Sequence, residues 1–179
     1  MSYDFDRVID RVGTHSAKWD KMEPLYGVSP EDGIPMWVAD MDFAAAPPIQ
    51  AALDRMRDVG VYGYYADDSG YRAAVGWWMA NRHGWEIESD WIFTTHGIVN
   101  AVALAMEACT DPGDGVVLMT PVYHAFHRII KAAGREIVEC PLVVNEGRHE
   151  MDFEAWDAQM TGSERMLILC SPHTPGGRV

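Results

Sequence analysis

Two continuous runs of apolar residues constrain the fold of this 179-residue chain more than any other feature. They are Gly115–Thr120, which contains VVLMT, and Met166–Cys170, which is MLILC. A short apolar run bounded by turn residues is typical of a strand that is buried on both faces, as in a parallel sheet. The sequence therefore predicts a sheet whose strands are joined by helices.

Other segments complete the alternation of strands and helices. Helices are predicted over Pro47–Val59, Gly70–His83, Ile98–Ala108, Tyr123–Ala133 and Phe153–Met160, and further strands over Trp91–Thr94 and Glu136–Cys140. This order indicates an α/β fold with a mainly parallel sheet covered on both faces. Residues 1–36 are polar, with a segment punctuated by Pro and Gly at Pro24–Pro35. Residues 1–45 are therefore predicted to form an arm and a small-domain segment, and residues 46–179 the α/β domain.

Composition excludes several classes of partner. The formal net charge is −13, which repels phosphate backbones and anionic membrane surfaces, so nucleic acid and membrane are not expected as partners. No stretch approaches the roughly 20 apolar residues of a membrane span. The odd cysteine count, with Cys109, Cys140 and Cys170, predicts no disulfide framework. The charged start predicts no secretory signal, and we expect a cytoplasmic protein.

Ligands bind open α/β sheets beyond the carboxyl ends of the strands, so the loops at those ends are the candidate site. In the first loop, THGIVN, Gly97 permits a tight turn before a helix. The free N–H groups of Gly97, Ile98 and Val99 and the helix dipole favour an anion there. An ordinary turn with its glycine is the alternative.

The second loop, Pro121–Tyr123, and the third loop, Ser171–Arg178, carry aromatic and polar side chains. Tyr123 follows a predicted strand. Its ring is expected either to stack on a flat heterocycle or to pack in the core. His124 and His127 share a helical face, and Cys170 and His173 form a C-x-x-H pair, but no further ligand completes a metal site with either.

Two segments near the start of the chain are unusual. In WVADMDF, Asp40 and Asp42 lie between apolar residues, which suits a structural or substrate-positioning role, although a close acid pair also serves acid–base chemistry. Val61–Tyr71 is rich in tyrosine, which indicates an interface or binding wall, or core packing.

Taken in order, these motifs resemble one family. FDRVIDRVGTHSAKWD, WVADMDF, YGY, RHGW, THGIVN, DPGDGVVLMTPVYHAF and CSPHTPGGRV are similar to segments of the cystathionine β-lyase and class I and II aminotransferase group of the maltose-regulon lyase type. These are fold-type-I enzymes that use pyridoxal 5'-phosphate (PLP). The resemblance implies the three-layer large domain of PLP-dependent transferases, aspartate aminotransferase-like and here incomplete, preceded by the arm.

The resemblance also implies roles for particular residues. Gly97, Ile98 and Val99 match the amides that hold the PLP phosphate, and Tyr123 matches the tyrosine that stacks on the pyridine ring. Tyr64 matches a residue that contacts the cofactor of the neighbouring subunit, which implies a homodimer.

Two further segments match family positions. Val38, Ala39 and Asp40 match a segment that lines the substrate site. Thr174 stands where the family usually has an asparagine that donates to the pyridoxal O3′, so contact with the cofactor at that edge rests on one hydroxyl.

The resemblance leaves the catalytic residue unassigned. Among the lysines, Lys18, Lys21 and Lys131, none matches the family's Schiff-base lysine. We therefore expect an incomplete chain that is inactive alone and, as a complete enzyme, a C–S β-lyase that converts a thioether amino acid to a thiol, pyruvate and ammonia. The alternatives are an aminotransferase, and a non-catalytic fragment or one half of a split enzyme. A nicotinamide-binding domain is disfavoured because no G-x-G-x-x-G follows a strand.

Overall fold

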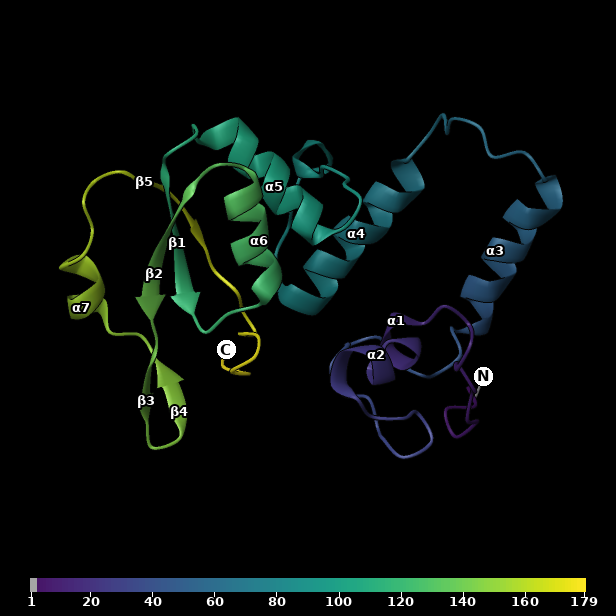
Figure 1. The fold of residues 1–179 in the computed structure, drawn as a ribbon. Coiled ribbons are helices and arrows are strands. Elements are labelled where there is room, and N and C mark those ends of the chain that lie inside the picture. The colour runs from purple at the N-terminus through teal and green to yellow at the C-terminus, as the bar shows by residue number, and fades with distance from the viewer. Residues whose placement is uncertain (1–2) are drawn as a thin grey trace. The chain divides into compact units, whose positions relative to one another are not determined.

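The computed structural model describes residues 3–179, which form two compact units that divide between Asp68 and Ser69 (Figure 1). The first unit contains two short helices, α1 (Ala17–Asp20) and α2 (Met22–Tyr26), and the longer α3 (Pro47–Val59). The helix predicted over Pro47–Val59 is confirmed, whereas α1 and α2 were not predicted. The predicted domain boundary after residue 45 stays a prediction.

The second unit contains the sheet and its helices. Its elements in order are α4 (Ser69–His83), η1 (Ser89–Trp91), α5 (Ile98–Cys109), β1 (Gly115–Thr120), α6 (His124–Ala132), β2 (Glu136–Pro141), β3 (Val143–Asn145), β4 (Arg148–Glu150), α7 (Phe153–Asp157) and β5 (Glu164–Ile168). The remaining predicted helices and three of the four predicted strands are confirmed, with ends shifted by a few residues. The hairpin of β3 and β4 was not predicted.

The main sheet has the order β2-β1-β5, and β1 pairs in parallel with both neighbours. Val116 lies opposite Ile137 of β2 and Met166 of β5. The parallel sheet predicted from the apolar runs is therefore confirmed. Among the described residues, no helix combines the length and the apolar character needed to cross a membrane.

Alternate residues of β1 enter two separate cores, because successive side chains of a strand point to opposite faces. Val116 and Leu118 pack with Met106 of α5 and with Phe126 and Ile130 of α6. On the other face, Val117 and Met119 pack with Trp156 of α7 and with Cys140. The sheet thus has helices on both faces, and α5 and α6 cover the same one (Figure 1).

The strand predicted over Trp91–Thr94 is wrong. Trp91 is the last residue of the 3₁₀ turn η1. Ile92 is extended, but no described strand pairs with the residues after η1. The guanidinium of Arg72 donates to the carbonyls of Ser89 at 2.7 Å and Ile92 at 2.9 Å. Side-chain hydrogen bonds therefore satisfy carbonyls that a neighbouring strand would otherwise bond.

A buried arginine joins the ends of α5 and α6. Arg135 is 4% exposed and donates to the carbonyls of Thr110 at 2.7 Å and Ala133 at 2.6 Å. It also donates to the Thr110 hydroxyl at 2.9 Å and to the Glu107 carboxylate at 2.9 Å. Carbonyls at a helix C-terminus have no partner within the helix, so a buried cation stabilises two helix ends at once.

We expect Arg135→Met to lower the free energy of unfolding of the second unit by about 2–3 kcal/mol, because it leaves buried carbonyls without donors. Urea unfolding followed by far-UV circular dichroism measures this change. Arg165→Met is the matched control, since Arg165 is exposed and bonds the carbonyl of an exposed turn at 2.9 Å. Equal effects of the two substitutions would show that Arg135 has no special role.

Candidate functional site

Two of the predicted loops leave the sheet at one edge. β1 and β5 are parallel neighbours, so the segments that follow them both begin at the carboxyl edge of the sheet. Tyr123 follows β1, and Thr174 follows β5. The structure therefore places these two predicted residues in neighbouring loops.

The first predicted loop also approaches this edge. The C-terminus of α5 lies at the opposite, amino edge, where Thr110 contacts Arg135 and Gly113 N–H donates to the Gly134 carbonyl at 2.9 Å. From there α5 runs back across the sheet, packing Met106 against β1 and β5. A helix of 12 residues is about 18 Å long, so its N-terminus at Gly97 points toward the carboxyl edge.

The start of α5 presents free amide groups. Gly97 has φ 92° and ψ 157°, a conformation that side chains rarely adopt, and its N–H donates to the Thr95 carbonyl at 2.9 Å. No described group accepts a hydrogen bond from the N–H groups of Ile98, Val99 or Asn100. Of the predicted amides, those of Ile98 and Val99 are therefore open to an anion, and sequence reasoning overlooked Asn100, the next residue of the same turn.

Tyr123 is the N-cap residue of α6 and is 38% exposed. Its ring contacts Phe126 edge-on, with centroids 5.6 Å apart, and His124 with centroids 5.0 Å apart. These contacts hold the ring while part of it stays accessible. The arrangement favours the interpretation of Tyr123 as a binding surface over that of a core tyrosine.

A buried histidine fixes the third loop. His173 is 8% exposed, and its Nε2 lies 3.4 Å from the Met119 carbonyl at the end of β1. Its Nδ1 accepts from Gly176 N–H at 3.2 Å, and its backbone N–H donates to the Arg178 carbonyl at 2.7 Å. Sequence reasoning considered His173 only as a metal ligand with Cys170. The described residues contain no group of three or more metal-ligating side chains.

Several cavities lie in the second unit, and two of them are near the sheet. One of about 500 Å³ is lined by Met119, by His173 and Arg178 of the third loop, and by Leu142 and His149. It adjoins the face that α7 covers, because Met119 packs with Trp156 there, whereas Tyr123 begins a helix on the other face. This cavity is therefore next to the predicted cofactor residues but does not contain them.

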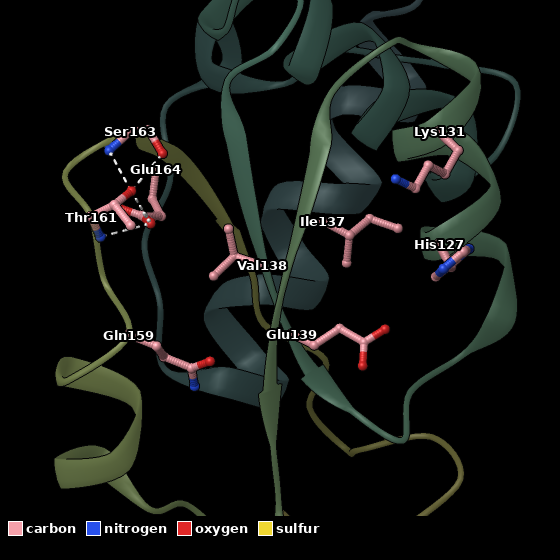
Figure 2. A pocket seen from close by; sticks show the side chains of 9 residues that line it. All are labelled: His127, Lys131, Ile137, Val138, Glu139, Gln159, Thr161, Ser163 and Glu164. Carbon is pink, nitrogen blue, oxygen red and sulfur yellow. Dashed lines mark hydrogen bonds between the residues drawn. The ribbon is translucent and has the colours of Figure 1, made fainter.

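The second of these cavities, of about 630 Å³, surrounds the free edge of β2. Figure 2 shows its lining side chains on both sides of this strand, with His127 and Lys131 of α6 on one side and Thr161, Ser163 and Glu164 on the other. Hydrogen bonds from the turn, foremost from Thr161 N–H, lower the pKa of the Glu164 carboxyl. That carboxylate is therefore used by its own turn, and the cavity includes none of the predicted site residues.

The remaining predicted residues belong to the first unit. The side chain of Tyr64 is fully exposed. Asp40 and Asp42 both pair with Arg11, at 2.5 Å and 2.7 Å, and Asp42 also pairs with Lys18 at 2.8 Å. The hydrogen bond from Lys18 is the main cause that lowers the pKa of Asp42 well below its usual range. Ion pairs with cations at both carboxylates support a structural role for the acid pair rather than acid–base chemistry.

Comparison with known proteins gives a consistent picture. Residues 37–179 match the family described as aminotransferase class I and II. Cystathionine beta-lyase PatB of Bacillus subtilis is 43% identical over 175 residues, which are 97% of this chain and 45% of that protein. Among solved structures, the PLP-bound putative aminotransferase from Clostridium difficile 630 has a TM-score of 0.90 and 36% identity, covering 99% of this chain and 46% of that one.

Cystalysin from Treponema denticola, whose crystal structure contains pyridoxal 5'-phosphate, has a TM-score of 0.89 and 40% identity. The match covers 100% of this chain and 46% of cystalysin. The chain therefore spans a little less than half the length of these similar proteins. Their fold confirms the expected large-domain architecture, with helices around a mainly parallel sheet.

The ion pairs of Asp42 predict how the first unit responds to acid. Because the folded-state pKa is lowered, the unfolded chain binds a proton first as pH falls. The stabilisation is complete above the unfolded pKa of about 3.9 and is lost as pH falls from there toward the folded value. Asp42→Asn should lower stability at neutral pH and make its dependence on pH below about 4 shallower.

Urea unfolding followed by tryptophan fluorescence across this pH range measures both effects. Asp32→Asn is the control, because Asp32 is exposed and its carboxylate has no bond among the described residues. If Asp42→Asn and wild type give the same pH dependence, the ion pairs do not stabilise the unit.

Proposed function

This chain belongs to the aminotransferase class I and II family, and from that premise we propose that it supplies the phosphate-binding and ring-stacking side of a PLP site. The observation that carries the proposal is the start of α5, where N–H groups of Ile98, Val99 and Asn100 are free at the positive end of a helix dipole. Such a turn binds a phosphate dianion in spite of the chain's negative net charge.

The structure offers space for the group at this position. A Cβ added to Gly97 would meet no heavy atom within 4 Å, so the turn is open on that side. The accessible part of the Tyr123 ring lies at the carboxyl edge toward which α5 points, which suits stacking on a pyridine ring. Thr174 lies in the loop that His173 fixes, next to the loop of Tyr123, and it offers a hydroxyl there.

We further propose that the complete enzyme is a carbon–sulfur β-lyase acting on a cystathionine-like thioether. When bound, PLP supplies an electron sink for the electrons released at the substrate Cα. The residues of this chain hold and orient the cofactor and, through Val38, Ala39 and Asp40, line the substrate. The names of the similar proteins support lyase chemistry, since PatB is a cystathionine beta-lyase.

Aminotransfer is the second candidate. Arginine–pyruvate transaminase AruH of Pseudomonas aeruginosa is 30% identical over 93% of this chain. Incubation with cystathionine distinguishes the two chemistries, because a lyase releases a thiol and pyruvate, whereas an aminotransferase requires a keto acid and releases no thiol. Both assays use the chain combined with a polypeptide that carries the remaining part of PatB.

Lys18 and Lys131 lie in settings that do not suit the Schiff base. Lys18 is bonded to the Asp42 carboxylate and the Asp40 carbonyl, both at 2.8 Å. Lys131 lies 3.6 Å from Glu136, which begins β2 at the amino edge. These contacts support our expectation that the covalent lysine is contributed by another part of the complete enzyme.

The assembly and location of the complete enzyme also belong to the proposal. The fully exposed Tyr64 is accessible to a neighbouring subunit, which supports a homodimer in which it contacts the partner's cofactor. We also propose a cytoplasmic location, which is supported by the odd number and wide spacing of Cys109, Cys140 and Cys170.

Titration with PLP tests the phosphate site. We expect the 179-residue chain to bind PLP but not pyridoxal, which lacks the phosphate. Gly97→Ala should weaken binding about tenfold or more, because the positive φ strains any side chain and moves the amides, each worth about 1.5–3 kcal/mol toward a charged group. Absorbance and fluorescence quenching give the dissociation constants.

Gly76→Ala is the matched control, because Gly76 lies in α4 without a positive φ and without a close neighbour. Borohydride reduction and peptide mapping should find no single lysine modified in stoichiometric yield. Equal affinity for PLP and pyridoxal, or a Gly97→Ala variant that binds like wild type, would count against the proposal.

A further inference from the structure

We infer that Lys18 is a positioning residue that fixes the backbone of Val38–Asp40 on the surface of the first unit. The inference rests on the proposed function, because only there does this segment line a substrate. Val38–Asp40 lies outside the helices and strands, so local hydrogen bonding does not define its conformation. Its order has to come from contacts with other parts of the unit.

The ammonium group of Lys18 supplies two such contacts. Lys18 is only 9% exposed, and its Nζ donates at 2.8 Å to the Asp40 carbonyl and at 2.8 Å to the Asp42 carboxylate. A buried ammonium is costly unless it is paired and hydrogen-bonded, so the lysine and its acceptors hold one another in place. One side chain thus fixes both the main chain and a flanking carboxylate of the segment.

The backbone of Lys18 fixes the other end of the segment. The Trp37 Nε1–H donates to the Lys18 carbonyl at 3.0 Å, and Trp37 directly precedes Val38. The neighbouring Trp19 Nε1–H donates to Asp42 at 3.0 Å. The substrate segment is therefore held at both ends by residues of α1.

Arg11 determines which groups of Asp40 are available to a substrate. Its guanidinium pairs with the Asp40 carboxylate at 2.5 Å and with the Asp42 carboxylate at 2.7 Å. The carboxylate of Asp40 is thereby occupied, and the segment has its backbone and the side chains of Val38 and Ala39 to offer. Lys18 acts on the substrate through this segment and does not contact the substrate itself.

Hydrogen exchange in the 179-residue chain tests the inference. Lys18→Met keeps the length of the side chain but removes the donor. We expect amide exchange in a peptide covering residues 36–43 to become about tenfold faster, with no change in α5 or in the dissociation constant for PLP. Lys18→Arg should restore slow exchange, because it returns a cation and donors.

Lys21→Met is the control, because Lys21 is exposed and forms no side-chain bond with a described residue. If Lys18→Met unfolds the whole first unit, Trp37→Phe decides by the same measurement, since it removes the bond to the Lys18 carbonyl and keeps an aromatic ring next to Tyr26. The inference is overturned if exchange at residues 36–43 stays at the wild-type rate, or if Lys18→Arg does not restore it.

The chain combined with a polypeptide that carries the remaining part of PatB allows a kinetic measurement as well. There Lys18→Met should raise KM for cystathionine about tenfold with less than about a twofold change in kcat, the pattern of lost uniform binding. A fall in kcat as large as the rise in KM contradicts a positioning role. Failure of the wild-type chain to bind PLP would instead refute the proposed function, and the exchange rates would still decide the role of Lys18.

Discussion

The guanidinium of Arg135 holds the amino edge of the sheet together, and the elements of the second unit depend on that edge for their direction. It joins the ends of α5 and α6 through the carbonyls of Thr110 and Ala133. β1 begins shortly after Thr110, and β2 begins at the residue after Arg135. Because two helices end and two strands begin at one buried cation, the helices start at the opposite edge, where the candidate site lies.

The proposed site draws on three loops that obtain their order in different ways. A glycine with a positive φ turns the chain into α5, packing against Phe126 holds Tyr123, and the buried His173 bonds its loop to the end of β1. None of these devices resembles another. They have in common that each is attached to an element of the rigid sheet layer, as a preorganised binding site requires.

Sequence patterns predicted the elements whose order comes from local spacing. The runs at Gly115–Thr120 and Met166–Cys170 gave the parallel strands, and the helical spacing at Ile98–Ala108 gave α5. The pattern failed at Trp91–Thr94, because strand formation depends on a partner and Arg72 occupies the carbonyls there. Propensity describes a segment alone and contains no information about its neighbours.

The same limit applies to the site. Gly97 and Tyr123 became candidates because each follows a predicted strand and precedes a helix, whereas Thr174 became one only through the resemblance to the family. The roles of Arg135, His173 and Lys18 depend on acceptors far away in the sequence, such as the Met119 carbonyl for His173. Nothing in the chain distinguishes these residues from exposed Arg, His or Lys, so only the structure reveals them.

The bonds that fix the third loop have a consequence for substitutions at position 174. They use the ring and backbone of His173 and the backbone of Gly176, Gly177 and Arg178, and no described residue bonds the side chain of Thr174. Folding of the loop is therefore independent of the side chain at position 174. A substitution at position 174 can thus change the polar group that this loop offers without disturbing the hydrogen bonds that hold the loop in place.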